Sequence, residues 1–214
     1  MKHIVWDWNG TLLDDTWLCY DIANAMMAER GMALLADEDA YREVFCFPII
    51  DYYRRMGYVF GEGREPYEAL SVQFVNSYEA KVHRCLLRAG AAELLRALKN
   101  SGRRQVLLSA TRLGRLRPQV DNLKLTATFE QILGLTDDLA HSKVALAQEF
   151  LAREKVAPED VIFIGDTDHD AAVAQACGCH CALLTGGHQG RATLEACAVP
   201  VFDTPRELAQ YLGV

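Results

Sequence analysis

The first residues of the chain carry the feature that most restricts its fold. A short apolar run, His3–Trp6, stops at the carboxylate of Asp7 and is followed at once by Asn9, Gly10 and Thr11. Such a run is typical of a buried strand in a parallel sheet, and Gly10 permits a tight turn directly after it. Because open α/β sheets bind ligands at the carboxyl ends of their strands, Asp7 is expected to lie at a ligand site.

Further apolar runs alternate with helical patterns through the second half of the chain. Ala91–Lys99 has leucines on one face and is followed by Gly102, a common stop signal, and Ser142 can cap a helix over Lys143–Glu154. The alternation predicts an α/β fold, with a Rossmann-like three-layer core built on a parallel sheet. The predicted strands are Ile4–Trp6, Gln105–Leu108, Gln131–Leu133, Val161–Ile164, Cys181–Leu184 and Val199–Phe202.

One region breaks this alternation. Between Asp15 and about Gly90 the pattern is helical, with no convincing strand. We therefore predict a core formed by residues 1–14 and 89–214, and an all-helical domain at 15–88 inserted on the ligand side. Its helices are expected around Leu18–Met26, at Asp37–Phe45 and Ile49–Met56, and along a stripe from Leu70 to Val82.

Composition narrows the class of protein. A chain of 214 residues with 50% hydrophobic content can bury a full core, and a net charge of −7 disfavours a nucleic-acid or anionic-membrane binder. The apolar runs are all shorter than the roughly 18 residues of a membrane span. Seven cysteines, an odd number, in a chain with a large core favour a reduced, cytoplasmic protein. Because the first predicted strand begins within the first few residues, we expect no signal peptide before it.

Later polar residues stand at positions comparable to that of Asp7. Ser109 follows an apolar strand, Lys143 opens a predicted helix, and Asp166 and Asp170 follow another apolar run, one helical turn apart. The carboxyl ends of parallel strands meet at one edge of a sheet, so these side chains are expected to converge. A lysine, a serine and several carboxylates together indicate chemistry on a phosphate group.

The segments around these residues resemble the four motifs of the haloacid dehalogenase-like hydrolases. Asp7–Asp14 resembles the first motif, Asp-X-Asp-Gly-Thr-Leu-X-Asp, and Leu107–Ser109 resembles the second, an apolar strand with a terminal Ser or Thr. His141–Lys143 resembles the third, and Gly165–Asp170 the fourth, Gly-Asp-X-X-X-Asp. The motifs follow the family's order and span essentially the whole chain. The resemblance implies a Rossmann-like core with a helical cap that closes over the site and excludes water.

The resemblance also implies a phosphatase that depends on Mg²⁺. Asp7 would be the nucleophile and would form an aspartyl-phosphate. The Mg²⁺ ligands would be Asp7, the backbone carbonyl of Asn9 and Asp166, with Asp170 either a ligand or a neighbour of the ligands. Mg²⁺ suits such an all-oxygen site, where it offsets the repulsion between a carboxylate and a phosphate.

The phosphate-binding residues follow from the same resemblance. Ser109 and the backbone at Ala110 would hold phosphate oxygens, and Lys143 would add positive charge and position the nucleophile. Gly10 and Thr11 would form the tight turn that lets the backbone approach the phosphate. The catalytic set implied in this way is Asp7, Asn9, Ser109 and Lys143.

The predicted cap resembles that of the phosphoglycolate-phosphatase-like members between Cys46 and Gly57. Within this stretch Tyr52, Arg54 and Arg55 are candidates for substrate contacts, since arginines can read a carboxylate or a phosphate. The expected partner is a small phosphorylated metabolite, and the expected protein is a monomer or a homodimer.

The chain departs from the family pattern at Asn9. Family phosphatases have an aspartate there, which acts as general acid and then base, and an amide cannot donate a proton in that way. General acid–base help is worth ~10²–10⁴-fold. Three explanations stay open: substrates with good leaving groups such as acyl or aryl phosphates, a replacement proton donor such as His169 or Tyr52, and an engineered or deamidation-prone Asn9-Gly10 sequence.

Two other functions remain alternatives. Asn9 motivates a catalytically weak protein that binds or senses a phosphorylated metabolite. Phosphonoacetaldehyde hydrolases of this superfamily share a Trp-containing first motif, but they need a cap lysine, and no lysine lies between Lys2 and Lys81. Haloacid dehalogenation is disfavoured because it does not need Asp166 and Asp170.

Two further sequence features have simple interpretations. The cysteines of Cys177–Cys181 lack a distant partner pair of the kind that zinc sites use, so we expect buried free thiols. His188 follows Thr185-Gly186-Gly187 on a loop and is expected at the surface, near the edge of the site.

Overall fold

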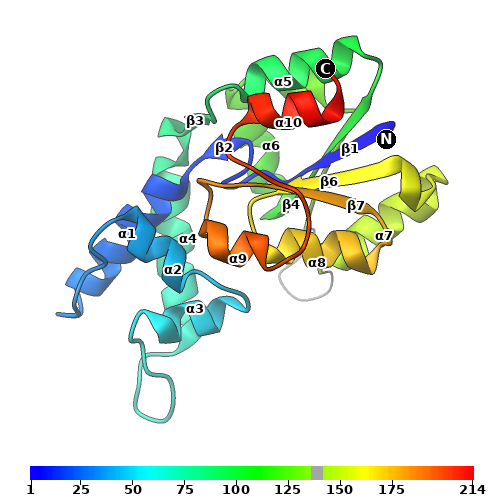
Figure 1. Cartoon of the computed structure of the whole chain (residues 1–214). Helices are drawn as coiled ribbons and strands as arrows, with labels where there is room; N and C mark the ends of the chain where they lie inside the picture. Colours follow the sequence, from blue (N-terminus) through cyan, green and yellow to red (C-terminus); the bar gives the residue numbers. More distant parts are fainter. Residues whose placement is uncertain (136–141) are drawn as a thin grey trace.

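The chain folds around a parallel sheet with a helical insertion at one end of it (Figure 1). The computed structural model describes residues 1–135 and 142–214. In that part of the chain a six-stranded sheet has the order β5-β4-β1-β6-β7-β8. Every pairing in it is parallel, and β1 lies between β4 and β6. These strands are β1 His3–Trp6, β4 Arg104–Arg112, β5 Gln131–Leu135, β6 Val161–Gly165, β7 His180–Leu184 and β8 Val201–Phe202.

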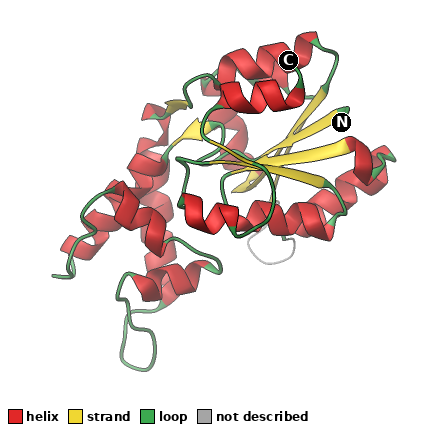
Figure 2. Cartoon of the chain, in the orientation of Figure 1, coloured by secondary structure: helices red, strands yellow, loops and turns green. Residues whose placement is uncertain are grey.

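Helices cover both faces of this sheet, which gives the three layers expected from the sequence (Figure 2). Leucines of α5 (Ala91–Asn100), α6 (Leu113–Asn122) and α10 (Pro205–Leu212) pack with Ile4 and Trp6 in one core cluster. Helices α7 (Lys143–Glu154), α8 (Asp168–Ala176) and α9 (Arg191–Glu195) pack with Val5 and its neighbours in the second cluster. Successive residues of β1 thus point to opposite faces, as a strand buried on both sides requires.

The helical insertion lies between two short strands. Strands β2 (Leu13–Asp14) and β3 (Leu86–Leu87) pair antiparallel at its base. The sequence pattern missed β3, because two residues are too few to show a periodicity. The insertion consists of α1 Thr16–Ala28, α2 Glu38–Val44, α3 Ile49–Arg55, α4 Tyr67–Lys81 and the 3-10 turn η1 Val82–Arg84.

Local signals set most element boundaries. The Ser142 hydroxyl accepts a hydrogen bond from the Ala145 N–H at 3.2 Å, so α7 begins at Lys143 as its cap predicts. His141, part of the third motif, lies outside the described residues. Two further 3-10 turns, η2 (Thr126–Thr128) and η3 (Pro158–Asp160), precede strands β5 and β6.

Strand β4 runs further than its apolar pattern predicts. Its pairing with β5 is regular through Leu108, then shifts register before Arg112. Ser109 therefore lies where the ladder becomes irregular, at the carboxyl edge of the sheet. No helix in the described part of the chain is long and apolar enough to cross a membrane.

Candidate active site

The end of β1 delivers Asp7 to a buried group of charges. The Asp7 N–H donates to the Ile164 carbonyl at 2.9 Å, so the first residue after β1 is still held against β6. The ammonium of Lys143 pairs with Asp7 Oδ1 and, at 2.5 Å, with Asp170 Oδ1. Lys143 thus lies between two carboxylates, as the convergence of the motifs predicts.

Asp170 also fixes the loop that follows β6. Its Oδ2 accepts hydrogen bonds from the Thr167 hydroxyl at 2.7 Å and from the N–H groups of Asp166 and Thr167. Thr167 caps α8 through this capping box. Both oxygens of Asp170 are therefore occupied by protein donors, and one of those donors is Lys143.

Asp166 is the third carboxylate of this group, within 4.8 Å of Asp7 and Asp170. It is fully buried, and its carboxylate accepts hydrogen bonds from the Thr11 hydroxyl and the His188 N–H, each at 2.7 Å. The turn at Gly10 passes so close that a Cβ there would lie 2.3 Å from Asp166 Oδ2. Gly10 has a φ of +70°, so both its conformation and the lack of space require glycine.

These four charged side chains, Asp7, Lys143, Asp166 and Asp170, form what we call the charged end of the site. Burial raises the pKa of Asp7 to about 7, although the Lys143 ammonium pulls it down. Burial also raises the pKa of Asp166, and the Asp170 charge adds to that effect. Burial disfavours the Asp170 carboxylate as well, but Lys143 outweighs it and holds the Asp170 pKa below its ordinary value.

The donor set at the charged end suits a hard divalent cation. Oxygen atoms of Asp7, Asp166 and Asp170 lie within 4.8 Å of one another, and one ammonium faces three carboxylates. Burial raises the pKa values of Asp7 and Asp166, and the neighbouring carboxylate charges add to the rise. An oxygen-binding ion such as Mg²⁺ fits this excess of carboxylate charge.

The side chain of Asn9 is held on all sides by hydrogen bonds. Its amide nitrogen donates to Asp15 Oδ2 at 2.8 Å and to the Tyr78 hydroxyl at 2.7 Å. Its oxygen accepts from the Thr111 hydroxyl at 2.8 Å. The Tyr78 hydroxyl donates in turn to Asp15 Oδ2 at 2.6 Å. These contacts define the amide's orientation and show a site built around an asparagine.

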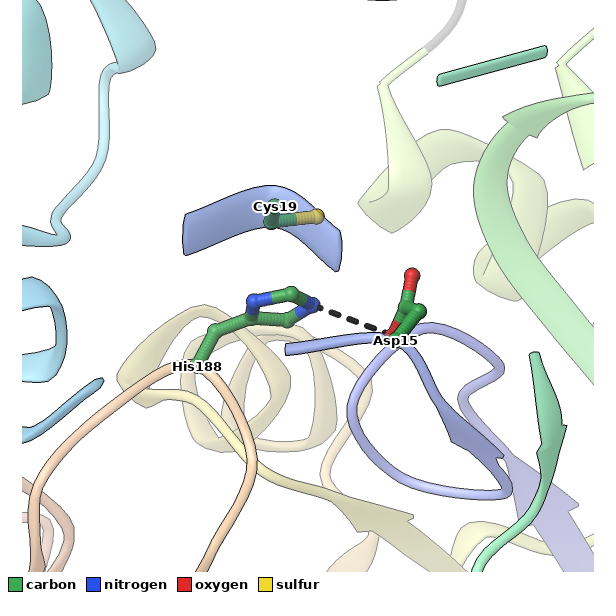
Figure 3. A group of neighbouring side chains, drawn as sticks. All are labelled: Asp15, Cys19 and His188. Atoms are coloured by element: carbon green, nitrogen blue, oxygen red, sulfur yellow. Dashed lines mark ion pairs between the residues drawn. The ribbon is translucent and has the colours of Figure 1, made fainter. Parts of the chain in front are cut away.

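Asp15 anchors this network from the start of α1. Its other oxygen, Oδ1, accepts from the Gly10 N–H at 2.7 Å and lies 3.5 Å from Nε2 of His188 (Figure 3). Burial acts to raise the pKa of Asp15, but its hydrogen bonds, that with His188 first, hold it below the ordinary value. A buried aspartate therefore stays ionised six residues after Asn9.

His188 is the counter-charge for Asp15. Its ring is buried, and Nδ1 lies 2.9 Å from the Tyr41 hydroxyl. Burial acts to lower the pKa of His188, but Asp15 outweighs it and raises the value to about 9. Cys19 lies beside the pair, within 4.8 Å of both partners, and burial raises the pKa of its thiol (Figure 3). The expectation of a surface histidine is wrong, because the loop after β7 turns His188 inward.

A cavity of about 410 Å³ opens between the charged end and the helical insertion. Asp7, Ser109, Ala110 and Lys143 line one side of it. Ser109 is buried, and its hydroxyl accepts from the Thr111 N–H at 3.1 Å. The opposite side is what we call the aromatic wall, which comprises Tyr41, Phe45, Phe47, Tyr52, Tyr53, Phe74 and Tyr78.

The three cap residues singled out in the sequence are placed differently. Tyr52 is buried and lines the cavity. Arg54 and Arg55 are exposed and do not line it, and Arg54 pairs with Asp51 at 2.6 Å. Tyr52, Tyr53 and Met56 share the buried face of this segment, and Arg54 and Arg55 lie about 100° or more around the helix from the centre of that face.

Comparisons with known proteins agree with the motifs. A family model described as haloacid dehalogenase-like hydrolase matches residues 4–184. The chain belongs to the haloacid dehalogenase-like hydrolase family. The match extends from β1 to the end of β7 and so includes each of the motif residues described above.

Relatives within this family carry the names of phosphatases. A phosphoglycolate phosphatase from Synechococcus elongatus is 26% identical over 98% of this chain and 96% of its own length. Phosphoglycolate phosphatase 1 from Pseudomonas aeruginosa is 30% identical, over 69% of this chain and 55% of its own length. The family and these relatives confirm the expected enzyme class, a phosphatase of the haloacid dehalogenase-like family.

Solved structures confirm the fold. A haloacid dehalogenase-like family hydrolase from Streptococcus pneumoniae aligns with a TM-score of 0.82 at 21% identity, over 99% of this chain and 98% of its own. Protein tyrosine kinase A from Mycobacterium tuberculosis aligns with a TM-score of 0.82 at 25% identity, over 100% of this chain and 98% of its own. The Rossmann-like core with an inserted helical segment is thus the fold of this haloacid dehalogenase-like protein.

The structure adds four residues to the site that sequence reasoning did not include. Asp15, Tyr78, Thr111 and His188 surround Asn9 or each other, yet none belongs to the motif positions used above. In the sequence, Asp15 can be noticed because it adjoins the first motif, and His188 because it follows two glycines. No local sequence pattern marks Tyr78 or Thr111 as a site residue.

The cysteine-rich segment packs as hydrophobic side chains. Its cysteines are all free thiols; Cys181 is buried in the second core cluster as expected, whereas Cys177 and Cys179, like Cys197, are only partly buried and pack against it. Among the described residues, the groups that could hold a metal do not include this segment.

Proposed function

We propose that this protein hydrolyses a small-molecule phosphomonoester in a Mg²⁺-dependent reaction through an aspartyl-phosphate on Asp7. The observation that carries the proposal is the pairing of Lys143 with both Asp7 and Asp170 beside a cavity, next to buried Asp166. A carboxylate nucleophile, a fixed cation and excess carboxylate charge for a metal are the parts that phosphoryl transfer needs.

Each residue at the charged end has a distinct part in this proposal. Asp7 attacks phosphorus, and Lys143 orients Asp7 and neutralises charge on the phosphate oxygens. Ser109, the backbone at Ala110 and the turn at Gly10 and Thr11 bind the remaining oxygens.

The metal would be held at the same place. Asp7, Asp166 and the backbone carbonyl of Asn9 would bind Mg²⁺, which supplies positive charge that offsets the repulsion between Asp7 and the phosphate. Both oxygens of Asp170 already accept hydrogen bonds or an ion pair, so we propose that it positions Lys143 rather than the ion.

The helical segment at 15–88 would act as a cap. Its helices carry the aromatic wall, so it would exclude water from the reacting phosphate and select the leaving group. In this proposal the partner is a small phosphorylated metabolite, as the names of the phosphoglycolate phosphatase relatives suggest, rather than a nucleic acid or a membrane. We place the protein in the cytoplasm as a monomer or homodimer.

A second candidate function is a protein that binds a phosphorylated metabolite with little turnover. It is favoured by one observation, the amide of Asn9, which is held by Asp15, Tyr78 and Thr111 and cannot donate a proton as a carboxylic acid does. Phosphonate hydrolysis through a lysine Schiff base is disfavoured. Of the described residues lining the cavity, Lys143 is the one lysine, and it is paired with two carboxylates.

The decisive experiment measures phosphate release with Mg²⁺ across aryl, acyl and alkyl phosphates, for the wild type and Asp7→Ala. We expect turnover that Asp7→Ala abolishes and that a chelator removes. Asp21→Ala, at an exposed position on α1, is the matched control and should keep full activity. Substrate binding without turnover that depends on Asp7 would replace the phosphatase by the binding protein.

A further inference from the structure

The side of the cavity formed by the insertion is rich in aromatic side chains. Phe45 stacks on the ring of His188 with centroids 5.1 Å apart, and Phe47 packs against His169 at 4.7 Å. Phe74 is stacked with Tyr78. These rings come from three helices or their ends and line one cavity, so the aromatic wall can surround a flat apolar group on several sides.

One polar group in this wall has no partner. The hydroxyl of Tyr52 is buried and makes no hydrogen bond within the part of the chain that the structure describes. Buried hydroxyls are nearly always paired, because leaving one unpaired costs about 1–3 kcal/mol. The Tyr52 side chain lines the cavity while its hydroxyl is buried away from it, so this side of the wall presents apolar surface to a ligand.

The chemistry at Asn9 favours the same kind of leaving group as the aromatic wall does. Asn9 cannot protonate a leaving oxygen, and its hydrogen bonds to Asp15, Tyr78 and Thr111 fix it in place. An alkoxide leaves slowly without a proton, whereas a phenolate leaves readily because phenols are far stronger acids than alcohols, with a pKa of about 10. A leaving group that suits Asn9 is therefore also one that suits an aromatic cavity.

We propose that the substrates of this enzyme are aryl phosphomonoesters, whose ring binds in the aromatic wall while the phosphate binds at the charged end. This inference rests on the proposed phosphatase function and specifies its substrate class. It separates this chain from an enzyme whose leaving group is a small hydroxy acid.

The reaction balances without a general acid. An oxygen of Asp7 forms a bond to phosphorus as the bond from phosphorus to the phenolic oxygen breaks, and the electron pair leaves on the phenolate. The phenolate then takes a proton from solvent. Water hydrolyses the aspartyl-phosphate, which restores the Asp7 carboxylate and releases inorganic phosphate, with the water's protons passing to phosphate and solvent.

A small acidic leaving group would need positively charged side chains in the cavity to bind its carboxylate. Arg112 and Arg115 line the cavity, and Glu79 lines it too. Burial raises the pKa of Glu79, and the positive charge of Arg115 opposes that rise. Seven aromatic side chains of the insertion outnumber these charged groups in the lining.

Four substrates separate the ring from the leaving oxygen. Phenyl phosphate has a ring and a good leaving group, benzyl phosphate has a ring and an alkyl oxygen, acetyl phosphate has a good leaving group without a ring, and phosphoglycolate has neither. We expect kcat/KM for phenyl phosphate to exceed that for phosphoglycolate by at least about 100-fold and that for benzyl phosphate by ~10²-fold. A higher kcat/KM for phosphoglycolate than for phenyl phosphate would overturn the inference.

Variants test whether the wall is responsible. Phe74→Ala should lower kcat/KM for phenyl phosphate about fivefold and leave acetyl phosphate within about twofold, since one lost ring contact is worth ~1 kcal/mol. Tyr52→Phe removes just the unpaired hydroxyl and should leave KM for phenyl phosphate within about twofold without lowering thermal stability. Phe60→Ala is the matched control, a half-buried phenylalanine of the insertion that does not line the cavity. Equal losses on phenyl and acetyl phosphate would contradict a ring-binding wall.

A binding measurement separates failure of this inference from failure of the proposed function. Phenylphosphonate and 3-phosphonopropionate, which cannot be hydrolysed at a P–O ester bond, are titrated calorimetrically with Mg²⁺ present. Tighter binding of phenylphosphonate, weakened by Phe74→Ala, supports the aromatic site even if no substrate is turned over. Preference for 3-phosphonopropionate overturns the inference even if Asp7-dependent turnover is found.

Discussion

The two sides of the cavity differ in how they are held. The charged end is built from paired side chains: Lys143 contacts Asp7 and Asp170, and Asp166 is bound by Thr11 and His188. The aromatic wall is built from ring contacts, which are weak individually and tolerate other shapes. A change at the charged end leaves a buried charge unpaired, whereas a change in the wall mainly reshapes a surface.

This difference teaches where function can vary in a fold of this kind. The four charged residues depend on one another, so each of them limits what the others can be. Most wall residues contact one another through their rings, but Tyr41 and Tyr78 also hydrogen-bond to His188, Asn9 and Asp15, so changes at those two positions reach the rest of the site.

Removing the shared cation should disrupt the charged end most strongly. Lys143→Met leaves Asp7 and Asp170 buried without their counter-charge, so we expect kcat to fall at least ~10³-fold. The free energy of unfolding should also fall by about 3–5 kcal/mol in metal-free buffer. Urea denaturation and phosphate-release assays measure both effects. Lys81→Met, at an exposed position, is the control, and a comparable loss there would refute a special role for Lys143.

Exchanging two residues should restore the missing proton donor. Asn9→Asp alone places a second carboxylate about where the amide now lies 2.8 Å from Asp15, so the two acids would share a proton. The exchange Asn9→Asp with Asp15→Asn keeps one amide and one carboxylate in contact. We expect it to raise kcat for benzyl phosphate ~10²-fold and to change phenyl phosphate little.

Asp15→Asn alone is the reference for that exchange. If the folded exchange variant turns over benzyl phosphate no faster than this reference, the account of Asn9 as a missing acid is wrong. A gain on phenyl and benzyl phosphate alike would show that Asn9 limits a step other than departure of the leaving group.

Backbone crowding gives a matched pair of glycine substitutions. Gly10→Ala would place a Cβ 2.3 Å from Asp166 Oδ2 at a φ of +70°, so we expect a loss of about 3 kcal/mol or more. Gly63 has nearly the same φ, +71°, and open space around its Cβ position, so Gly63→Ala should cost about 1 kcal/mol. Chemical denaturation measures both, and equal costs would show that conformation alone, without the contact to Asp166, sets the requirement for glycine.

The smallest expected effect depends on pH. The pKa of His188 is raised to about 9 from an ordinary value of 6.5, so its ion pair with Asp15 contributes fully below about pH 6.5. That contribution, at most about 3 kcal/mol, is lost as the pH rises through about 9. In metal-free buffer, thermal unfolding of wild type and His188→Gln should therefore differ most at pH 6 and converge near pH 10. His180→Gln, at an exposed position, is the control, and a difference that grows with pH would contradict the pairing.

Local patterns were enough to predict most of the core. The helix Lys143–Glu154 begins and ends as its cap and periodicity indicate, and strand β1 ends at Trp6, directly before Asp7. Periodicity and capping are short-range effects, so a single sequence displays them. The pairing of Leu86–Leu87 with Leu13–Asp14 was missed because it depends on residues far apart and leaves no local repeat.

The sequence by itself determined that Asp7, Ser109, Lys143 and Asp166 would share one edge of a parallel sheet, because strand ends converge there whatever the side chains do. Only the tertiary structure decided what surrounds Asn9. Its partners Tyr78 and Thr111 are 69 and 102 positions away along the chain, and no local pattern links them. The aromatic wall was likewise settled by the packing of the inserted helices, since shape and contact between distant segments depend on how the whole chain folds.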